Sequence, residues 1–305
     1  MIEPAGFLGL SRQLPDGRRP RIVLFGAPHG SSYPDADAES HAQAAKAIRA
    51  ASAEDAGLID NWDFDLDGPL FADQPVSCVD IGDLPTSSGA NAQNRSLIEK
   101  TTRDVLAGEA VPIMIGGDDS TPIPFISGFS GSGPIWILQI DAHIDWLEER
   151  QGERFGYSSP MRRASEMAHV EGIVQVGIRA VGSARSSDLQ AAERNGAKLV
   201  TARHFHAHGA EDAVQHIPEG ARILITLDCD GLDPGIMPGV AARTPGGLSY
   251  FQTVELIEAA GRRGRIAGFD LVELYPPADV DGISALTASR ILVNVIGRIV
   301  RQPWT

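Results

Sequence analysis

The chain has 305 residues, of which 43% are hydrophobic and 22% charged, and its formal net charge is -14 at pH 7. This length and composition allow a buried core in one large domain or two modest ones. The acidity argues against binding to nucleic acid or to an anionic membrane surface. We expect no segment to reach membrane-spanning length, and the first residues lack the basic start and apolar stretch of a signal peptide, so a cytoplasmic protein is expected.

Short apolar segments alternate along the chain with amphipathic stretches, after an N-terminal arm over residues 1–20 that contains three prolines. The pattern predicts eight strands, at Arg21–Phe25, Val76–Ile81, Val111–Ile115, Ile135–Ile140, Gly172–Ile178, Lys198–Thr201, Arg222–Leu227 and Arg265–Leu271. Helices are predicted near Glu39–Ala56, Ala90–Ala107, Asp188–Asn195, Glu211–His216, Ser249–Arg263 and Ser284–Arg298. The Gly-, Pro- and Asp-rich segments Asn61–Pro75 and Gly231–Gly247 are predicted loops. Such alternation predicts one α/β domain over residues 21–305, with a parallel sheet covered on both faces.

Three acidic strings directly follow predicted strands: Asp141-Ala142-His143-Ile144-Asp145, Asp228-Cys229-Asp230 and Gly116-Gly117-Asp118-Asp119-Ser120. Side chains alternate along a strand, so alternate members of a string should point the same way, and the carboxyl ends of parallel strands meet at one edge. Unpaired charges gathered there would repel one another, whereas divalent cations remove that cost. The sequence therefore predicts a metal site, whose six candidate ligands are Asp119, Asp141, His143, Asp145, Asp228 and Asp230.

The composition of this ligand set favours particular ions. Five carboxylates and one imidazole suit a hard or borderline ion such as Mn²⁺ better than a structural zinc. So many carboxylates also suit two ions, because one carboxylate can bridge ions about 3.5–4 Å apart. A single Asp-x-Asp after a strand is often only a turn or a cap. Three such strings at three strand ends make that explanation insufficient.

Other residues with metal-binding or packing chemistry are expected to be structural. Cys78 and Cys229 lie in strand-like segments and are expected to be buried thiols, with Cys229 pointing away from its acidic neighbours. The His204–His208 segment, with three histidines, is predicted at a loop-to-helix junction without accompanying acids, and we do not expect it to bind a metal. Trp146 adjoins Asp145 and is a candidate to border the substrate pocket.

Taken together, the strings resemble the ureohydrolase superfamily of arginases, agmatinases and related hydrolases, most closely its agmatinase-like branch. The similarity runs from about Arg21 to Arg298 and includes the segments 79–83, 116–119, 141–145, 227–234, 245–248 and 268–273. The resemblance implies a three-layer α/β arginase-like fold with a central eight-stranded parallel sheet. It also implies two divalent ions, Mn²⁺ first and Ni²⁺ as an alternative, and assembly into trimers or hexamers.

The resemblance further implies a mechanism, in which a hydroxide bridging the metals attacks the guanidinium carbon and releases urea and an amine. By position, Asp145 matches the carboxylate that hands a proton to the leaving nitrogen. Glu273 matches the acid that orients the guanidinium group. The chemistry requires these parts, because water must become hydroxide near neutral pH and an amine leaves poorly unless it is protonated.

The chain departs from the family pattern at four places near the expected pocket. Asp119 stands where the family has histidine, which changes the charge and reach of one ligand. Tyr157 occupies a stretch where a His-Gly pair is expected, and it is a candidate catalytic residue that could donate a hydrogen bond, although its reference pKa near 10 makes it a poor proton shuttle. Arg243 lies in a loop that usually carries an acid, and it should discourage a cationic substrate. His29 stands where an Asp is usual.

These departures leave two hypotheses. The first is a metal-dependent amidinohydrolase that cleaves a C–N bond in a small guanidino or amidino compound, with Glu273, Arg243 and Trp146 around the substrate. The second is a weakly active or inactive subunit that supports an active homologue in a hetero-oligomer, for example in a biguanide or guanylurea hydrolase. The retained acids favour the first hypothesis, and Asp119 and Tyr157 favour the second.

Overall fold

The computed structural model describes residues 6–15, 17–182 and 184–303. Within them, eight strands form one sheet: β1 (Ile22–Ala27), β2 (Cys78–Asp83), β3 (Val111–Gly116), β4 (Ile135–Ile140), β5 (Val170–Ile178), β6 (Lys198–Thr201), β7 (Arg222–Asp228) and β8 (Arg265–Val272). The eight predicted strands are confirmed, with bounds within two residues of those expected. Apolar β-branched segments specify them because such side chains pack well on a pleated, buried surface.

All neighbouring strands are parallel, and their order is β2-β1-β3-β8-β7-β4-β5-β6. The candidate acidic residues come at or just after the ends of the four central strands, β3, β8, β7 and β4. Their register aligns the carboxyl ends, since Leu271 of β8 pairs with both Ile115 of β3 and Leu227 of β7. The sheet topology thus brings four loops together at one edge, which is where open α/β sheets bind ligands.

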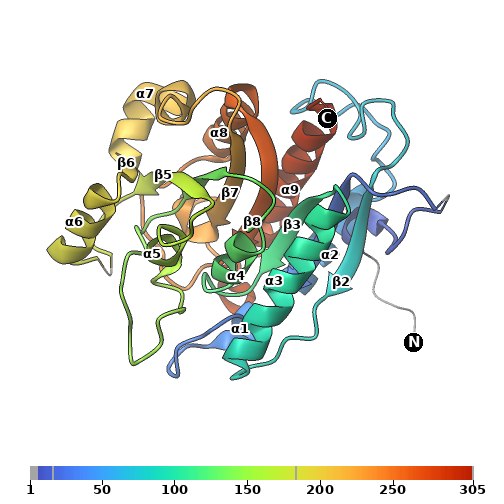
Figure 1. Cartoon of the computed structure of the whole chain (residues 1–305). Helices are drawn as coiled ribbons and strands as arrows, with labels where there is room; N and C mark the ends of the chain where they lie inside the picture. The colour runs from blue at the N-terminus through green and yellow to red at the C-terminus, as the bar shows by residue number, and fades with distance from the viewer. Residues whose placement is uncertain (1–5, 16, 183, 304–305) are drawn as a thin grey trace.

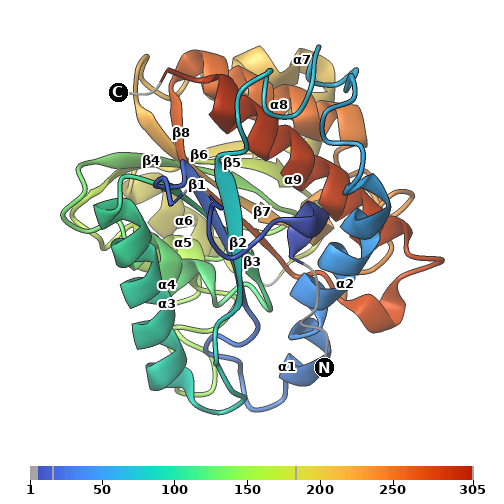
Figure 2. The same cartoon turned by 90° about the vertical axis from the view of Figure 1, so that its right-hand side faces the viewer.

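Helices cover both faces of the sheet, so the protein has three layers (Figures 1 and 2). One face carries α2 (Ala44–Ala51), α7 (Ala202–Val214), α8 (Tyr250–Arg263) and α9 (Ile283–Arg301), and the other carries α3 (Asn91–Ala107), α4 (Pro122–Ser127), α5 (Pro160–Ala164) and α6 (Ser186–Arg194). Alternate residues of β1 divide between the two layers: Leu24 joins the core under α2 and α9, whereas Phe25 joins the core under α3 and α4.

The helices follow the predicted pattern with three differences. The helix expected at Glu39–Ala56 is divided into α1 (Ala38–His41), α2 and a short 3-10 turn at Ser52–Asp55. The helix expected to begin near Glu211 begins instead at Ala202 and is interrupted at Gly209, where φ is 79°. The short helices α4 and α5 lie outside the predicted helical ranges. Each begins at a proline, which is tolerated in a first helical turn.

Helix α9 corrects the expectation that no segment reaches membrane-spanning length. Its 19 residues have a mean hydropathy of 1.5 in their most apolar window, enough to cross a membrane by length and composition. Within the protein, however, 78% of that window is buried, and α9 contacts α2 and α8. This is the burial of a core helix, because a helix that is apolar on most sides must be covered by protein or lipid.

The described part of the N-terminal arm packs against the domain. Phe7 and Leu8, in a 3-10 turn at Phe7–Gly9, are buried in the same core as β1, and the Phe7 amide donates a hydrogen bond to Asp80 of β2 at 2.7 Å. These residues are therefore part of the core rather than a free extension. Residues 1–5 and 16 of the expected arm lie outside the described residues.

Candidate metal centre

Short turns, rather than strand alternation, aim the acidic side chains at one another. Strand β4 ends at Ile140, so the 141–145 string lies in irregular structure, and Asp145 has a φ of 50°. The Asp141 carboxylate accepts a hydrogen bond from the His143 amide at 2.6 Å, and Asp228 accepts one from the Asp230 amide at 2.7 Å. These are side-chain turns that Asp forms readily. Five of the six expected side chains converge, but Asp145 and Asp230 lie beyond the ends of their strands, so strand alternation does not place them.

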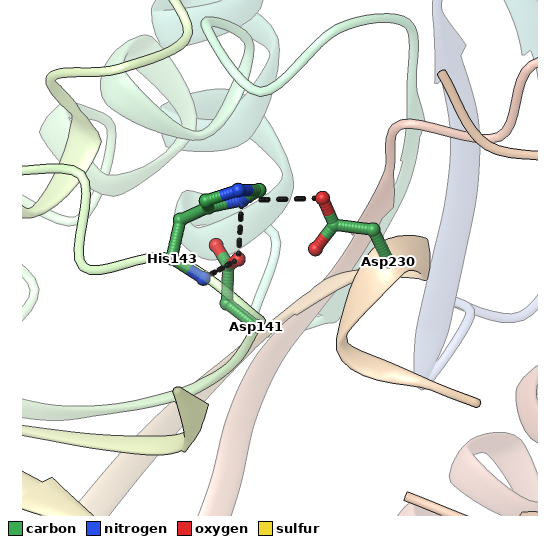
Figure 3. A group of neighbouring side chains, drawn as sticks. All are labelled: Asp141, His143 and Asp230. Carbon is green, nitrogen blue, oxygen red and sulfur yellow. Dashed lines mark hydrogen bonds and ion pairs between the residues drawn. The ribbon is translucent and has the colours of Figure 1, made fainter. Parts of the chain in front are cut away.

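Five of the six predicted ligands form two groups. The first group is Asp141, His143 and Asp230, and the second is Asp119, Asp141 and Asp228, with potential ligand atoms inside each group within 4.8 Å of one another. Asp141 belongs to both groups. In the first, His143 Nδ1 lies 3.2 Å from Asp230 and 3.4 Å from Asp141 (Figure 3). A carboxylate that belongs to both groups suits a site for two neighbouring ions.

Burial and mutual repulsion shift the protonation of these groups. Burial, together with the nearby carboxylates, raises the pKa values of Asp119, Asp141 and Asp228 well above the usual range. The hydrogen bond that His143 donates to Asp230 raises the pKa of His143 to about 10 against the effect of burial, and the same contact lowers the pKa of Asp230. Burial and mutual repulsion therefore oppose the ionisation of Asp119, Asp141 and Asp228 unless positive charge lies nearby.

The residues present fit divalent cations. The second group is entirely buried, and Asp119 Oδ2 is buried without a hydrogen-bond partner among the described residues. An unpaired buried carboxylate oxygen is costly, and a cation at the group it faces would satisfy it. Oxygen and imidazole donors of this kind suit Mn²⁺ and, through the imidazole, also Ni²⁺.

Asp145 falls outside both groups. Its carboxylate accepts a hydrogen bond at 2.7 Å from the side-chain amide of Gln139, whose nitrogen also lies 2.6 Å from Asp141. Gln175 donates to Gln139 in turn, and the indole of Trp146 donates to Gln175 at 2.8 Å. The assignment of Asp145 as a ligand and proton donor stays a prediction. Trp146 is only 1% exposed, and its ring packs in the core while its indole supports this chain of amides. Its place beside the substrate stays a prediction.

Glu273 reaches the same cluster from the end of β8. Its Oε1 accepts the backbone N–H of Asp119 at 2.8 Å, and its Oε2 lies 2.9 Å from His41 Nε2. It adopts a φ of 62°, which is uncommon for a residue with a side chain. Its side chain is 15% exposed and that of His143 is 23% exposed, so the site has access to solvent beside these two residues.

The other predicted pocket residues, Tyr157 and Arg243, belong to neither ligand group. The Tyr157 hydroxyl accepts a hydrogen bond from Arg150 at 2.7 Å, and burial raises the Tyr157 pKa, which opposes a role as a proton shuttle. Arg243 donates to the backbone carbonyls of Pro238 at 2.6 Å and Ala278 at 2.7 Å. Its guanidinium group is thus used to hold two loops together. Both assigned roles remain predictions.

The contacts of the two cysteines and of the histidines at 204–208 show where these residues lie. Cys229 is buried in the core, as expected, and Cys78 is likewise a buried free thiol. The three histidines at 204–208 lie within α7, and the expectation that no acid accompanies them was wrong, since His204 pairs with Asp212 at 2.8 Å. That pair is exposed and belongs to neither ligand group.

Sequence reasoning missed three residues that touch this centre. His41, Gln139 and Arg179 come from α1, β4 and the segment after β5. The Arg179 guanidinium donates to the backbone oxygens of Asp230 at 2.6 Å and Thr244 at 2.7 Å, and so ties the loop 231–247 to a candidate ligand. Gln139 carried a signal, because a buried amide inside an apolar strand needs partners. His41 carried none, since nothing in its local sequence points to Glu273.

The fold and the cluster can now be compared with known proteins. The model of the Arginase family matches residues 20–297. N(1)-aminopropylagmatine ureohydrolase of Thermus thermophilus is 35% identical over 220 residues, covering 70% of this chain and 71% of that protein. Guanidinobutyrase of Pseudomonas aeruginosa is 27% identical over 228 residues, covering 72% and 70%. The structure of proclavaminate amidino hydrolase from Streptomyces clavuligerus superposes with a TM-score of 0.86 at 25% identity, covering 97% of each chain.

These similarities define an α/β protein of the arginase fold. The chain belongs to the arginase family, whose hydrolases act on guanidino and amidino compounds. The expected fold, an eight-stranded parallel sheet between two layers of helices, is confirmed.

Proposed function

We propose that this protein is a metal-dependent amidinohydrolase that cleaves a C–N bond of a small guanidino or amidino compound and releases urea or a urea-like product. The observation that carries the proposal is the pair of ligand groups sharing Asp141 at the centre of the sheet edge. The names of the relatives, an aminopropylagmatine ureohydrolase and a guanidinobutyrase, support the reaction class. We propose two Mn²⁺ ions, with Ni²⁺ as the alternative, and an oligomeric, cytoplasmic enzyme.

Each residue of the centre has a distinct task in this proposal. Asp119, Asp141, His143, Asp228 and Asp230 would hold the ions, which lower the pKa of water from about 15.7 toward about 7 and so supply hydroxide at neutral pH. Asp145 is positioned beside Asp141 by Gln139 and is the proposed acid for the leaving nitrogen. Glu273 is proposed to hold the planar N–H donors of the substrate, since a carboxylate matches their geometry.

Reconstitution tests this function. The protein is stripped of metal, reloaded with Mn²⁺ or Ni²⁺, and assayed for urea release from a panel of guanidino amines, guanidino acids, biguanides and guanylurea. Metal-dependent urea release from one class supports the proposal. Two bound equivalents of metal without release from any class would contradict it and favour the alternative, a subunit that supports an active homologue. Co-purification from the native host then identifies that homologue.

A further inference from the structure

Both oxygens of the Glu273 carboxylate are already engaged within the protein. Oε1 accepts the Asp119 N–H at 2.8 Å, and Oε2 lies 2.9 Å from His41 Nε2. His41 ends α1, and its side chain is 9% exposed. Glu273 is the carboxylate at the accessible side of the centre, so its charge decides what kind of group can bind there.

The hydrogen bonds of His41 define where its protons are. His41 Nδ1 lies 3.0 Å from the backbone oxygen of Asp37, which can only accept, so Nδ1 carries a hydrogen. The contact between Nε2 and the Glu273 carboxylate then requires a hydrogen on Nε2 as well, because two lone pairs would otherwise face each other at 2.9 Å. An imidazolium paired with a carboxylate gives the pair of His41 and Glu273 no net charge. Consistently, the contact with Glu273 outweighs burial and raises the pKa of His41 to about 9.

Neighbouring groups fix the imidazole in this position. The His41 ring packs against Tyr275 with the ring centroids 5.0 Å apart. The Tyr275 hydroxyl donates to the Asp37 side chain at 2.7 Å, and that side chain also caps α1 by accepting the Ser40 amide at 3.1 Å. The histidine is thus held from α1 on one side and from the segment after β8 on the other. This is a built contact rather than a chance approach of two surface groups.

A neutralised carboxylate recognises a different substrate group from a free one. A free carboxylate attracts a guanidinium cation through charge-assisted hydrogen bonds, which are roughly twice as strong as neutral ones. Paired with His41, Glu273 keeps lone pairs that can accept N–H donors but loses most of its net charge. Uncharged N–H donors still form hydrogen bonds with Glu273, whereas a permanently cationic group loses part of the charge–charge attraction that a free carboxylate would provide.

We propose that His41 is a specificity-determining residue that lowers the affinity of the centre for permanently cationic guanidinium groups. It thereby favours weakly basic amidines and guanidines, such as those conjugated to a carbonyl group, whose lowered basicity lets them bind uncharged. This inference rests on the proposed function of the same site and names its substrate class. The partner residue is Glu273, through which His41 acts.

Two planar probes of the same shape, guanidinium and urea, separate charge from geometry. Their binding to the Mn²⁺-loaded protein is measured by calorimetry at pH 7.5, in wild type and in two variants. His41→Gln can place an uncharged amide N–H where Nε2 was, and His41→Asn keeps an N–H toward Asp37. His204→Gln is the matched control, because His204 pairs with Asp212 on the exposed side of α7 instead of with Glu273.

We expect both His41 variants to bind guanidinium about tenfold more tightly, with urea binding changed by less than about twofold. If His41 had only a structural role, its replacement would weaken the binding of guanidinium and the binding of urea together. Unchanged or weaker guanidinium binding in whichever variant folds, or no guanidinium binding in any of the proteins, would overturn the inference. The assay needs no turnover, so a failure of urea release would count against the proposed function alone.

Discussion

The side-chain amide of Gln139 lies 2.6 Å from the carboxylate of Asp141, the one residue shared by both ligand groups. The same nitrogen lies 2.7 Å from Asp145, so one neutral amide serves two buried carboxylates. A donor of this kind orients acids without adding charge, and outer partners of metal ligands commonly govern affinity. The geometry of the centre therefore depends on a residue that is not itself a candidate ligand.

Replacement of this amide should weaken metal binding. Gln139→Met keeps an unbranched side chain of similar size but removes both donated hydrogen bonds. We expect Mn²⁺ affinity to fall by about 10–100-fold, as is typical for outer partners of ligands, with turnover falling alongside. Titration calorimetry measures the affinity. Gln215→Met, which removes an exposed bond from Gln to Asp212, is the control, and an unaltered Mn²⁺ affinity in Gln139→Met would refute the positioning role.

Asp230 should be essential as a charged ligand. Asp230→Asn keeps the size of the side chain but removes the charge that pairs with His143. We expect loss of at least one equivalent of bound metal and of urea release, since carboxylate ligands supply the compensating charge. Metal analysis after gel filtration measures occupancy. Asp233→Asn, three residues along the same loop, should retain both; normal occupancy in Asp230→Asn would show that the ligand assignment is wrong.

Replacement of Asp119 tests whether this residue tunes the choice of metal. Asp119→His exchanges a carboxylate for an imidazole, and imidazole ligands suit Ni²⁺ while carboxylates suit Mn²⁺. We expect the ratio of Ni²⁺ to Mn²⁺ affinity to rise by about tenfold or more. Competitive dialysis against both ions measures this ratio. If neither affinity changes, Asp119 is not a ligand, in spite of its place in the second group.

The buried acids should make the metal-free protein sensitive to rising pH. Burial and mutual repulsion raise the pKa values of Asp119, Asp141 and Asp228 in the folded state. A group with a raised folded pKa favours folding below its unfolded pKa near 3.9 and loses that contribution as pH rises toward the folded value. The Tm of metal-free protein should therefore fall relative to that of the Mn²⁺-loaded protein between pH 5 and pH 8.

Thermal melts of both forms across this range, in buffers of equal ionic strength, measure the difference in Tm. Metal binding should also release protons, which calorimetry in two buffers of different ionisation enthalpy detects. A difference in Tm that stays constant with pH, together with no proton release, would mean that these acids are already ionised without metal.

Arg179 should hold the loop 231–247 in place through its fork of donors. Besides Asp230 and Thr244, it donates to the backbone oxygens of Gly231 and Leu232, each at 3.2 Å. Lysine cannot match this planar geometry, so Arg179→Lys should cost about 1–3 kcal/mol and raise KM more than it lowers kcat. Arg263→Lys, which removes an Arg bond to the Ile217 carbonyl away from the centre, should lower stability without changing KM. Equal KM effects in the two variants would rule out a loop-positioning role.

The sequence by itself determined the scaffold and the kind of site. Apolar β-branched segments such as Ile135–Ile140 specify buried strands by local composition, and acids that directly follow four of them must meet at one edge of a parallel sheet. Both features follow from residues that are close together in the sequence. The acids Asp119, Asp141, Asp228 and Asp230 were therefore predictable, as was the burial of Cys229.

The tertiary structure alone decided which groups touch those acids from elsewhere. His41 and Glu273 are 232 residues apart in the chain, yet their side chains meet at 2.9 Å because α1 contacts the segment that follows β8. Likewise, Asp145 has a positive φ of 50° and belongs to neither ligand group, which no alternation rule could indicate. Contacts between distant segments depend on packing and loop conformation. Neither produces a periodic pattern in the sequence from which the contact could be predicted.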